Sequence, residues 1–219
     1  MKIDRKELIK MHNPVLTEIS PESPLTVGNG ELAFTADITG MQTLYHDYSI
    51  VPLCTMSQWG WHTEPVDEKR YDYSLDDLVM TEYDLNGRKT AYPKRKQPGN
   101  EAVYDWLREN PHRLNLVRVG LVLDKKEITA SVIGSVHQEL HLYEGILESR
   151  FTVENDPYQV ETACDNEGNQ TLAFRITGQA LERGKLGVKI DFPYGSPDIS
   201  GSDWEKKERH HTECLKEEC

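Results

Sequence analysis

The segment Ser57–His62 carries the side chains best suited to hold a small polar ring. A pyranose ring presents an apolar C–H face and a rim of hydroxyl groups. An exposed indole offers a flat apolar surface to that face, and Gln and His side chains exchange hydrogen bonds with the rim. Because Gly60 lies between two Trp residues, the backbone can turn tightly there. The segment therefore predicts a sugar-binding role for Gln58, Trp59, Trp61 and His62.

A structural role competes with this interpretation. Trp is highly buried on average, so Trp59 or Trp61 could belong to the core, with its indole N–H bonded internally. The sugar-binding hypothesis requires at least one of the two indoles to lie at the edge of a site or between domains.

Asn29 is a further candidate substrate-binding residue, flanked by Gly28 and Gly30. Its amide group could bind a ligand hydroxyl. Asn and Gly also tolerate positive φ, and an Asn in such a sequence more often serves the turn itself. We favour the turn.

Other catalytic chemistry finds little support in the sequence. No Gly-x-Ser-x-Gly elbow is present, and no Ser or Cys nucleophile stands at a recognisable spacing from His12, His46, His112 or His137. The 37 acidic residues must include carboxylate pairs by chance. Such a pair supports glycoside cleavage only where it lies in a cleft and one pKa is raised.

Metal and cofactor binding are not expected. The tail holds His210, His211, Cys214 and Cys219, but their spacing matches no zinc pattern. Cys54 and Cys164 stand in apolar or strand-like contexts and are expected to pack as small hydrophobic residues. Without a Cys-x-x-Cys pair, a disulfide framework is not expected either.

The composition excludes several partners. A formal net charge of −12 opposes nucleic-acid binding, which needs a basic surface. The mean hydropathy is −0.65, and no apolar run approaches the roughly 20 residues of a membrane span. The first residues are charged and are not followed by an apolar segment of the kind found in secretory signals. We expect a cytoplasmic protein that contacts neither nucleic acid nor membrane.

The elements that must position these residues are mainly strands. Asp4 is expected to cap a helical turn over residues 6–11, Asn100 a helix over residues 101–109, and Asn86-Gly87 predicts a hairpin. Apolar or alternating segments predict strands over 31–38, 114–123, 128–136, 139–142, 147–154, 160–162, 172–177 and 185–192. Many short strands between Gly, Asn and Asp turns indicate a mostly-β fold: a large antiparallel β-sandwich with one or two short helices. The sandwich is expected over 1–195, followed by a polar tail over 196–219.

Several motifs together resemble the amino-terminal β-sandwich, or supersandwich, of six-hairpin glycosidase-like proteins. Residues 138–151 are similar to that group's Q-x-L-D-L-W-x-G-x-L-x-S-x-F, with His141 in place of Asp and Tyr143 in place of Trp. Residues 37–43 follow its D-x-T-G-x-Q-T, and residues 184–195 its G-x-L-x-V…F-P-Y-G. The segment 13–34 also resembles the start of these proteins, so the likeness covers nearly the whole chain.

The resemblance implies a supporting role in a carbohydrate-active protein. In maltose-phosphorylase-like and α-fucosidase-like enzymes, such a sandwich precedes a helical (α/α) barrel that supplies the catalytic acids. The partners implied are a carbohydrate ligand and a barrel domain outside these 219 residues, with the polar tail as the start of the linker. Asp37, Thr39 and Gln42 would line the cleft or tie a strand end to a neighbouring loop. Whether the chain is part of an enzyme stays open, and alone it is expected to be inactive.

Two alternatives remain. A free-standing carbohydrate-binding module would present Trp59 or Trp61 on a surface that works without a second domain. A truncated, inactive gene product would expose an apolar face and aggregate.

Overall fold

The computed structural model describes residues 3–63, 73–93, 96, 98–109, 111–196 and 200–213. Within these ranges the protein is a mostly-β, sandwich-like molecule with antiparallel pairing, as the sequence predicts. Its helices are short: α1 (Arg5–Lys10), α2 (Glu101–Glu109) and α3 (Gln179–Glu182). The third was not expected, because a four-residue helix leaves no periodic signal. No described helix is long and apolar enough to cross a membrane.

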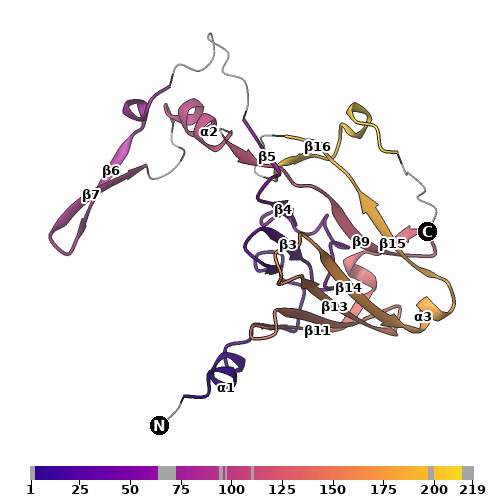
Figure 1. Ribbon diagram of the computed structural model, residues 1–219. Helices are drawn as coiled ribbons and strands as arrows, with labels where there is room; N and C mark the ends of the chain where they lie inside the picture. Colours follow the sequence, from indigo (N-terminus) through magenta and orange to yellow (C-terminus); the bar gives the residue numbers. More distant parts are fainter. Residues whose placement is uncertain are drawn as a thin grey trace.

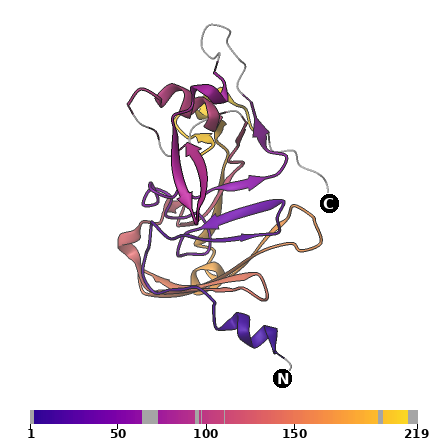
Figure 2. The ribbon, with the colours of Figure 1, turned by 90° about the vertical axis from the view of Figure 1, so that its left-hand side faces the viewer.

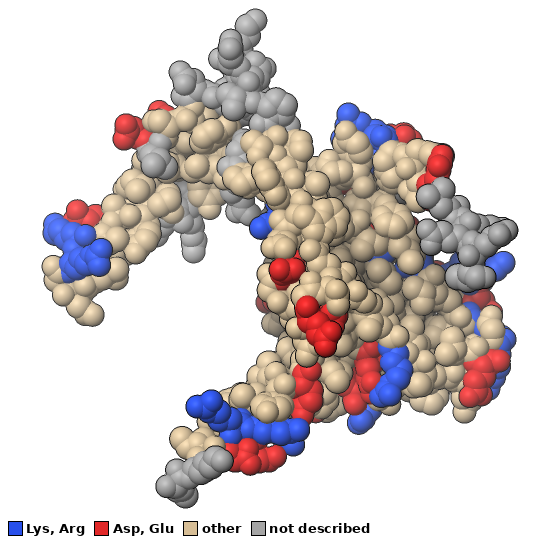
Figure 3. All heavy atoms as spheres, viewed as in Figure 1, with Lys and Arg blue, Asp and Glu red and all other residues tan. Residues whose placement is uncertain are grey.

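One layer is a five-stranded sheet in the order β1-β11-β12-β13-β14. Its strands are β1 (Val15–Leu16), β11 (Ile133–His141), β12 (Ile146–Val153), β13 (Asp156–Cys164) and β14 (Leu172–Gly178). Burial alternates along β12, where Leu147, Phe151 and Val153 point into the core. The outer face is charged. Arg150 forms an ion pair with Glu148, and Arg175 forms one with Glu161, each with 2.5 Å between Nη2 and a carboxylate oxygen. Figure 3 shows both signs of charge interspersed along the lower surface in that view.

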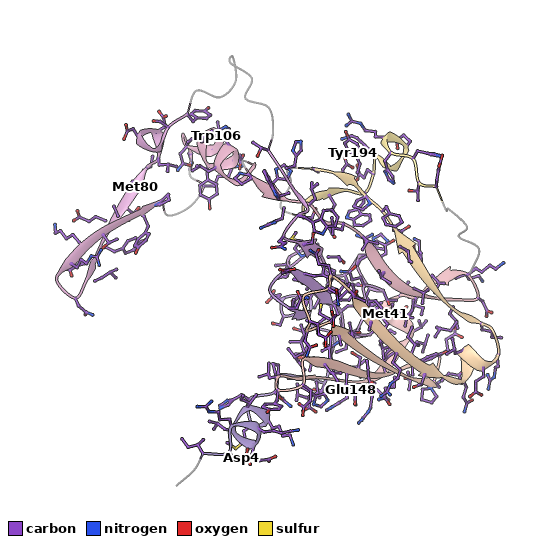
Figure 4. All side chains as sticks on the ribbon, in the orientation of Figure 1. Asp4, Met41, Met80, Trp106, Glu148 and Tyr194 are labelled. Carbon is purple, nitrogen blue, oxygen red and sulfur yellow. The ribbon has the colours of Figure 1, made fainter. Side chains whose placement is uncertain are left out.

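The opposite layer combines two three-stranded sheets, β2-β3-β4 and β10-β9-β15. Their strands are β2 (Leu25–Gly28), β3 (Leu32–Ala36), β4 (Thr55–Ser57), β9 (Arg118–Leu123), β10 (Lys126–Glu127) and β15 (Leu186–Asp191). Phe34 of β3 meets Phe174 of β14 edge to face at 5.3 Å, which joins the layers at one end. Met41 lies between the layers, fully buried against Phe151 and its neighbours (Figure 4).

Two parts extend from the sandwich (Figures 1 and 2). At one end α1 begins at Asp4, whose Oδ1 accepts from the backbone N–H groups of Lys6 and Glu7. On the other side an arm carries α2 and the hairpin of β6 (Met80–Leu85) and β7 (Arg88–Pro93), with a 3-10 turn over Leu75–Asp77. Asn86 and Gly87 both have positive φ, which confirms the predicted hairpin turn.

Residues after 195, where the sequence predicts only a polar tail, contact the sandwich. β16 (Tyr194–Gly195) pairs with β17 (Ser202–Asp203), and a 3-10 turn follows over Lys207–Arg209. The guanidinium of Arg118 lies between the rings of Tyr45 and Trp204, 3.5 and 3.7 Å from their centroids. Trp204, in the predicted polar tail over 196–219, therefore packs against Arg118 of β9.

The remaining strands join the arm to the sandwich. β5 (Trp61–His62) pairs with β8 (His112–Arg113). Elsewhere, a 3-10 turn over Ala130–Val132 leads into β11. The sequence predicts one strand over 114–123, but only Arg118–Leu123 is regular. Residues 114–116 bond instead to the backbone of three other segments, at Gly60, Gly201 and Thr55.

Candidate functional site

The predicted site residues lie near one end of the strands of the β2-β3-β4 sheet, where three chain segments meet. These segments are the turn before β3, the loop between β4 and β5, and the loop between β13 and β14. Asn29 links the first to the third, because its Nδ2 donates to the carbonyl oxygens of Asp165 (2.9 Å) and Asn169 (3.2 Å). Its Oδ1 accepts from the backbone N–H groups of Glu31 and Leu32 at 3.0 and 2.8 Å.

These four hydrogen bonds use the whole bonding capacity of the Asn29 amide. The side chain therefore shapes the turn and holds the loop 165–169, in agreement with the structural role that we favour. Its contribution to a ligand site is to position neighbouring groups.

Trp59 and Trp61 are the most exposed indoles of the described residues, with 62% and 56% of their surface accessible. Trp59 Nε1 donates a hydrogen bond to Oε1 of Gln170, which fixes the ring against the β13–β14 loop. Trp61 lies in β5 opposite Arg113 of β8. The Trp59 ring and the Trp61 backbone are therefore held by the protein, while a large part of both indole surfaces stays accessible.

Gly60 allows this arrangement for a reason beyond a tight turn. A Cβ at this position would lie 2.8 Å from Cδ2 of Leu116. The backbone N–H of Gly60 donates to Oγ of Ser57 at 3.2 Å, and its carbonyl accepts from Leu114 at 2.8 Å. Residues 114–116 thus approach the backbone at Gly60 too closely for a side chain there.

A groove of about 240 Å³ lies beside this loop. Its walls are the turn at Gly28–Ala33, the strand end at Met56–Gln58, and Arg113. Arg113 Nη1 donates to the carbonyl oxygens of Ser57 (3.1 Å) and Gln58. The groove is smaller than the roughly 300–1,000 Å³ of typical small-molecule sites, so it suits one ring of a ligand that continues over the open surface.

The structure brings Gln58 to this groove, while Trp59, Trp61 and His62 lie outside its lining. His62 is exposed and faces His112, with ring centroids 5.3 Å apart. Sequence reasoning missed Arg113 and Gln170. Arg113 stands in a polar segment without a motif, and Gln170 meets Trp59 only through a contact 111 positions apart.

Asp37, Thr39 and Gln42 do not line a cleft, because all three are fully buried. Asp37 Oδ1 accepts from the N–H (2.8 Å) and hydroxyl (2.6 Å) of Thr39, and its Oδ2 from the N–H of Leu44 (2.5 Å). Gln42 donates to the carbonyl of Thr35 at 3.0 Å and accepts from the N–H of Val119 at 3.2 Å. Asp37 and Thr39 tie the end of β3 to the loop that follows it, which is the second of the two roles considered for them, and Gln42 adds a bond to β9.

Burial raises the pKa of Asp37 to about 6, against the opposing effect of its hydrogen bonds. A raised carboxyl pKa can mark a general acid, but this carboxyl is enclosed by its own loop and cannot reach a substrate. Burial likewise raises the pKa of Cys54 to about 11 and raises that of Cys164, so both remain thiols at neutral pH.

Metal-binding geometry is absent from the described ranges, where no group of three or more His, Cys, Asp or Glu side chains could hold an ion. Cys214 and Cys219 of the tail lie outside those ranges.

No protein-family model, no curated protein and no solved structure matches the chain significantly. The resemblance to six-hairpin glycosidase-like sandwiches therefore stays a prediction from the motifs.

Proposed function

We propose that this chain is a non-catalytic β-sandwich domain of a carbohydrate-active protein, with a surface that binds neutral sugar beside Trp59 and Trp61. The observation that carries the proposal is the exposure of both indoles, at 62% and 56%, next to a groove lined by Gln58 and Arg113. Large aromatic surfaces are costly to leave in water, at about 25 cal/mol per Å².

The combination suits a sugar better than a purely apolar ligand. The indole faces would stack on the C–H face of a pyranose, and the Gln58 amide and Arg113 guanidinium would meet its hydroxyl groups. In the whole protein this surface would form one wall of a cleft, and a helical barrel domain would supply the catalytic carboxylates. The buried position of Asp37 fits a sandwich that does not itself cleave glycosidic bonds.

Intrinsic Trp fluorescence, titrated with a panel of neutral mono- and oligosaccharides, tests the sugar contact. We expect a saturable change with a millimolar Kd, which corresponds to about −4 kcal/mol, and its loss in Trp59→Ala or Trp61→Ala. Trp106→Phe is the control, because Trp106 lies on α2 (Figure 4) and is not among the residues that line the groove. No response to any sugar, in fluorescence and in amide chemical shifts of residues 57–62, would contradict the proposal.

A free-standing carbohydrate-binding module is the second candidate, favoured by the fact that both indoles are exposed in this chain alone. Binding by the isolated chain supports it. A neighbouring reading frame that encodes a helical barrel would favour the wall of a larger enzyme instead. Turnover of an aryl glycoside by the isolated chain, lost on substitution of one carboxylate, would overturn both.

A further inference from the structure

β15 combines two features of an interaction surface. It ends its sheet, since within the described residues it pairs with β9 and with no strand on its other side. It also exposes an apolar stripe: Val188, Ile190 and, directly after the strand, Phe192 are 49%, 57% and 44% accessible. An open strand edge with apolar side chains is a template for pairing with another strand.

We propose that β15 is the contact surface of a symmetric homodimer, in which the β15 strands of two copies pair antiparallel with Ile190 on the two-fold axis. Such a contact would extend each three-stranded β10-β9-β15 sheet into one continuous sheet across both copies. An isologous contact of this kind is closed and does not propagate into fibres.

Geometry restricts the register of such a pair. Side chains alternate between the two faces of a strand, and residues opposite each other must point to the same face. In a symmetric antiparallel pair the axis must therefore pass through a residue and not between two. The candidate axis positions along the exposed stripe are Val188, Lys189, Ile190 and Asp191.

Charge and the apolar stripe together select among these four registers. An axis at Val188 places Phe192 opposite the partner's Gly184, where the ring meets no apolar side chain. An axis at Lys189 places two Lys side chains opposite each other, and an axis at Asp191 places two Asp side chains opposite each other. With the axis at Ile190, each Lys189 faces the partner's Asp191. Opposite charges directly across a strand pair stabilise it, and like charges destabilise it. Lys189 and Asp191 already share one face, with Nζ 2.8 Å from Oδ2.

The apolar face agrees with the same register. Val188 lies opposite the partner's Phe192, and the two Ile190 side chains meet at the axis. β-branched and aromatic side chains form the most favourable cross-strand pairs. At the ends, Pro193 lies opposite the partner's Gly187, which has no side chain to clash with the ring. The contact thus covers the stripe that β15 leaves exposed in one copy.

Sedimentation equilibrium of the full chain tests the association. At about 100 µM chain, a dimer with a micromolar Kd is largely formed. We therefore expect a molar mass twice the 25.1 kDa of one chain. Ile190→Lys should raise the dissociation constant at least about tenfold, because it places two ammonium groups at the axis. Leu142→Lys is the matched control, since Leu142 is also exposed, at 43%, but lies outside β15. A monomeric wild type, or a dimer unchanged by Ile190→Lys, would overturn the proposal.

Cysteine cross-linking tests the register in a background where Cys214 and Cys219 are replaced by Ser. Ile190→Cys should form an intermolecular disulfide under mild oxidation, because opposed Cα atoms lie about 4.5–5.5 Å apart. Val188→Cys should not, because its two copies would lie four residues apart along the strands, a separation of about 14 Å. Equal cross-linking of both variants, or none by Ile190→Cys, would overturn the assigned register.

Discussion

Burial and hydrogen bonding act in opposite directions on the Asp37 carboxyl. The side chain has no accessible surface, so desolvation disfavours its charged form, while Thr39 and Leu44 donate hydrogen bonds that favour it. Burial dominates, and the pKa rises from about 3.8 to about 6. The folded state therefore binds this proton more tightly than the unfolded chain does.

This shift predicts the sign of a pH dependence. Stability contributed by Asp37 is fully present below about pH 3.8 and is lost as the pH rises through about 6. Asp37→Asn lacks this titration. The free energy of unfolding of the wild type, relative to that of Asp37→Asn, should fall by about 2 kcal/mol from pH 4 to pH 7. Urea unfolding at the two pH values measures it. A difference that grows with pH would show that the hydrogen bonds outweigh burial, and a constant difference would show that the two effects cancel.

Among the elements, the turn after β3 holds the two layers together. The carbonyl oxygen of Gly40 accepts from the Thr162 hydroxyl at 2.6 Å, and that of Asp37 accepts from Gln138 Nε2 at 2.7 Å. Gly40 has a φ of +78°, and a Cβ there would lie 2.8 Å from Oγ of Ser149. The turn is therefore pressed against the inner face of β12.

Gly40→Ala should lower the free energy of unfolding by about 3 kcal/mol, because positive φ and overpacking add. Gly145→Ala is the control, with a similar φ of +70° and no atom within 4 Å of the added Cβ. It should cost only the backbone share, about 1 kcal/mol. Thermal or urea unfolding gives both values. Equal losses would mean that the contact with β12 carries no stability.

Local signals in the sequence predict those elements whose side chains repeat or whose turns need special residues. The alternation around Phe151, the Asn86-Gly87 turn and the cap at Asp4 all correspond to observed structure. Contacts between distant segments carry no such signal. The attachment of Trp204 to Arg118 and the bond from Trp59 to Gln170 depend on tertiary placement.

The same distinction applies to the candidate site. Residue types at 57–62 suggest a sugar surface, but the exposure of each indole depends on tertiary placement that those residue types do not encode. The full use of the Asn29 amide depends on the loop at 165–169, far away in sequence. The sequence therefore nominates these residues, and only the packing separates those that can contact a ligand from those that shape the loops.

At the scale of the whole molecule, the C-terminal segment packs against β9 in the layer of the two three-stranded sheets. The Trp204 ring covers one face of the half-buried Arg118 guanidinium, and the Tyr45 ring covers the other face. β17 of the same segment pairs with β16. The guanidinium of Arg209 lies over the ring of Tyr194 (labelled in Figure 4), 4.5 Å from its centroid. The segment should thus unfold together with the sandwich and not before it.

Trp204→Ala tests this coupling. A cation–π contact at a partly desolvated site contributes about 1–2 kcal/mol, and the loss of apolar burial adds to it, so we expect the free energy of unfolding to fall by about 2–3 kcal/mol. Trp59→Ala removes the same side chain from an exposed site and should change stability by no more than about 0.5 kcal/mol. Hydrogen exchange at Ser202 and Asp203 gives the second measurement, because amides that unfold only with the whole sandwich exchange at its global rate. Fast exchange there in the wild type, or equal effects of the two substitutions, would show that the sandwich is stable without this segment.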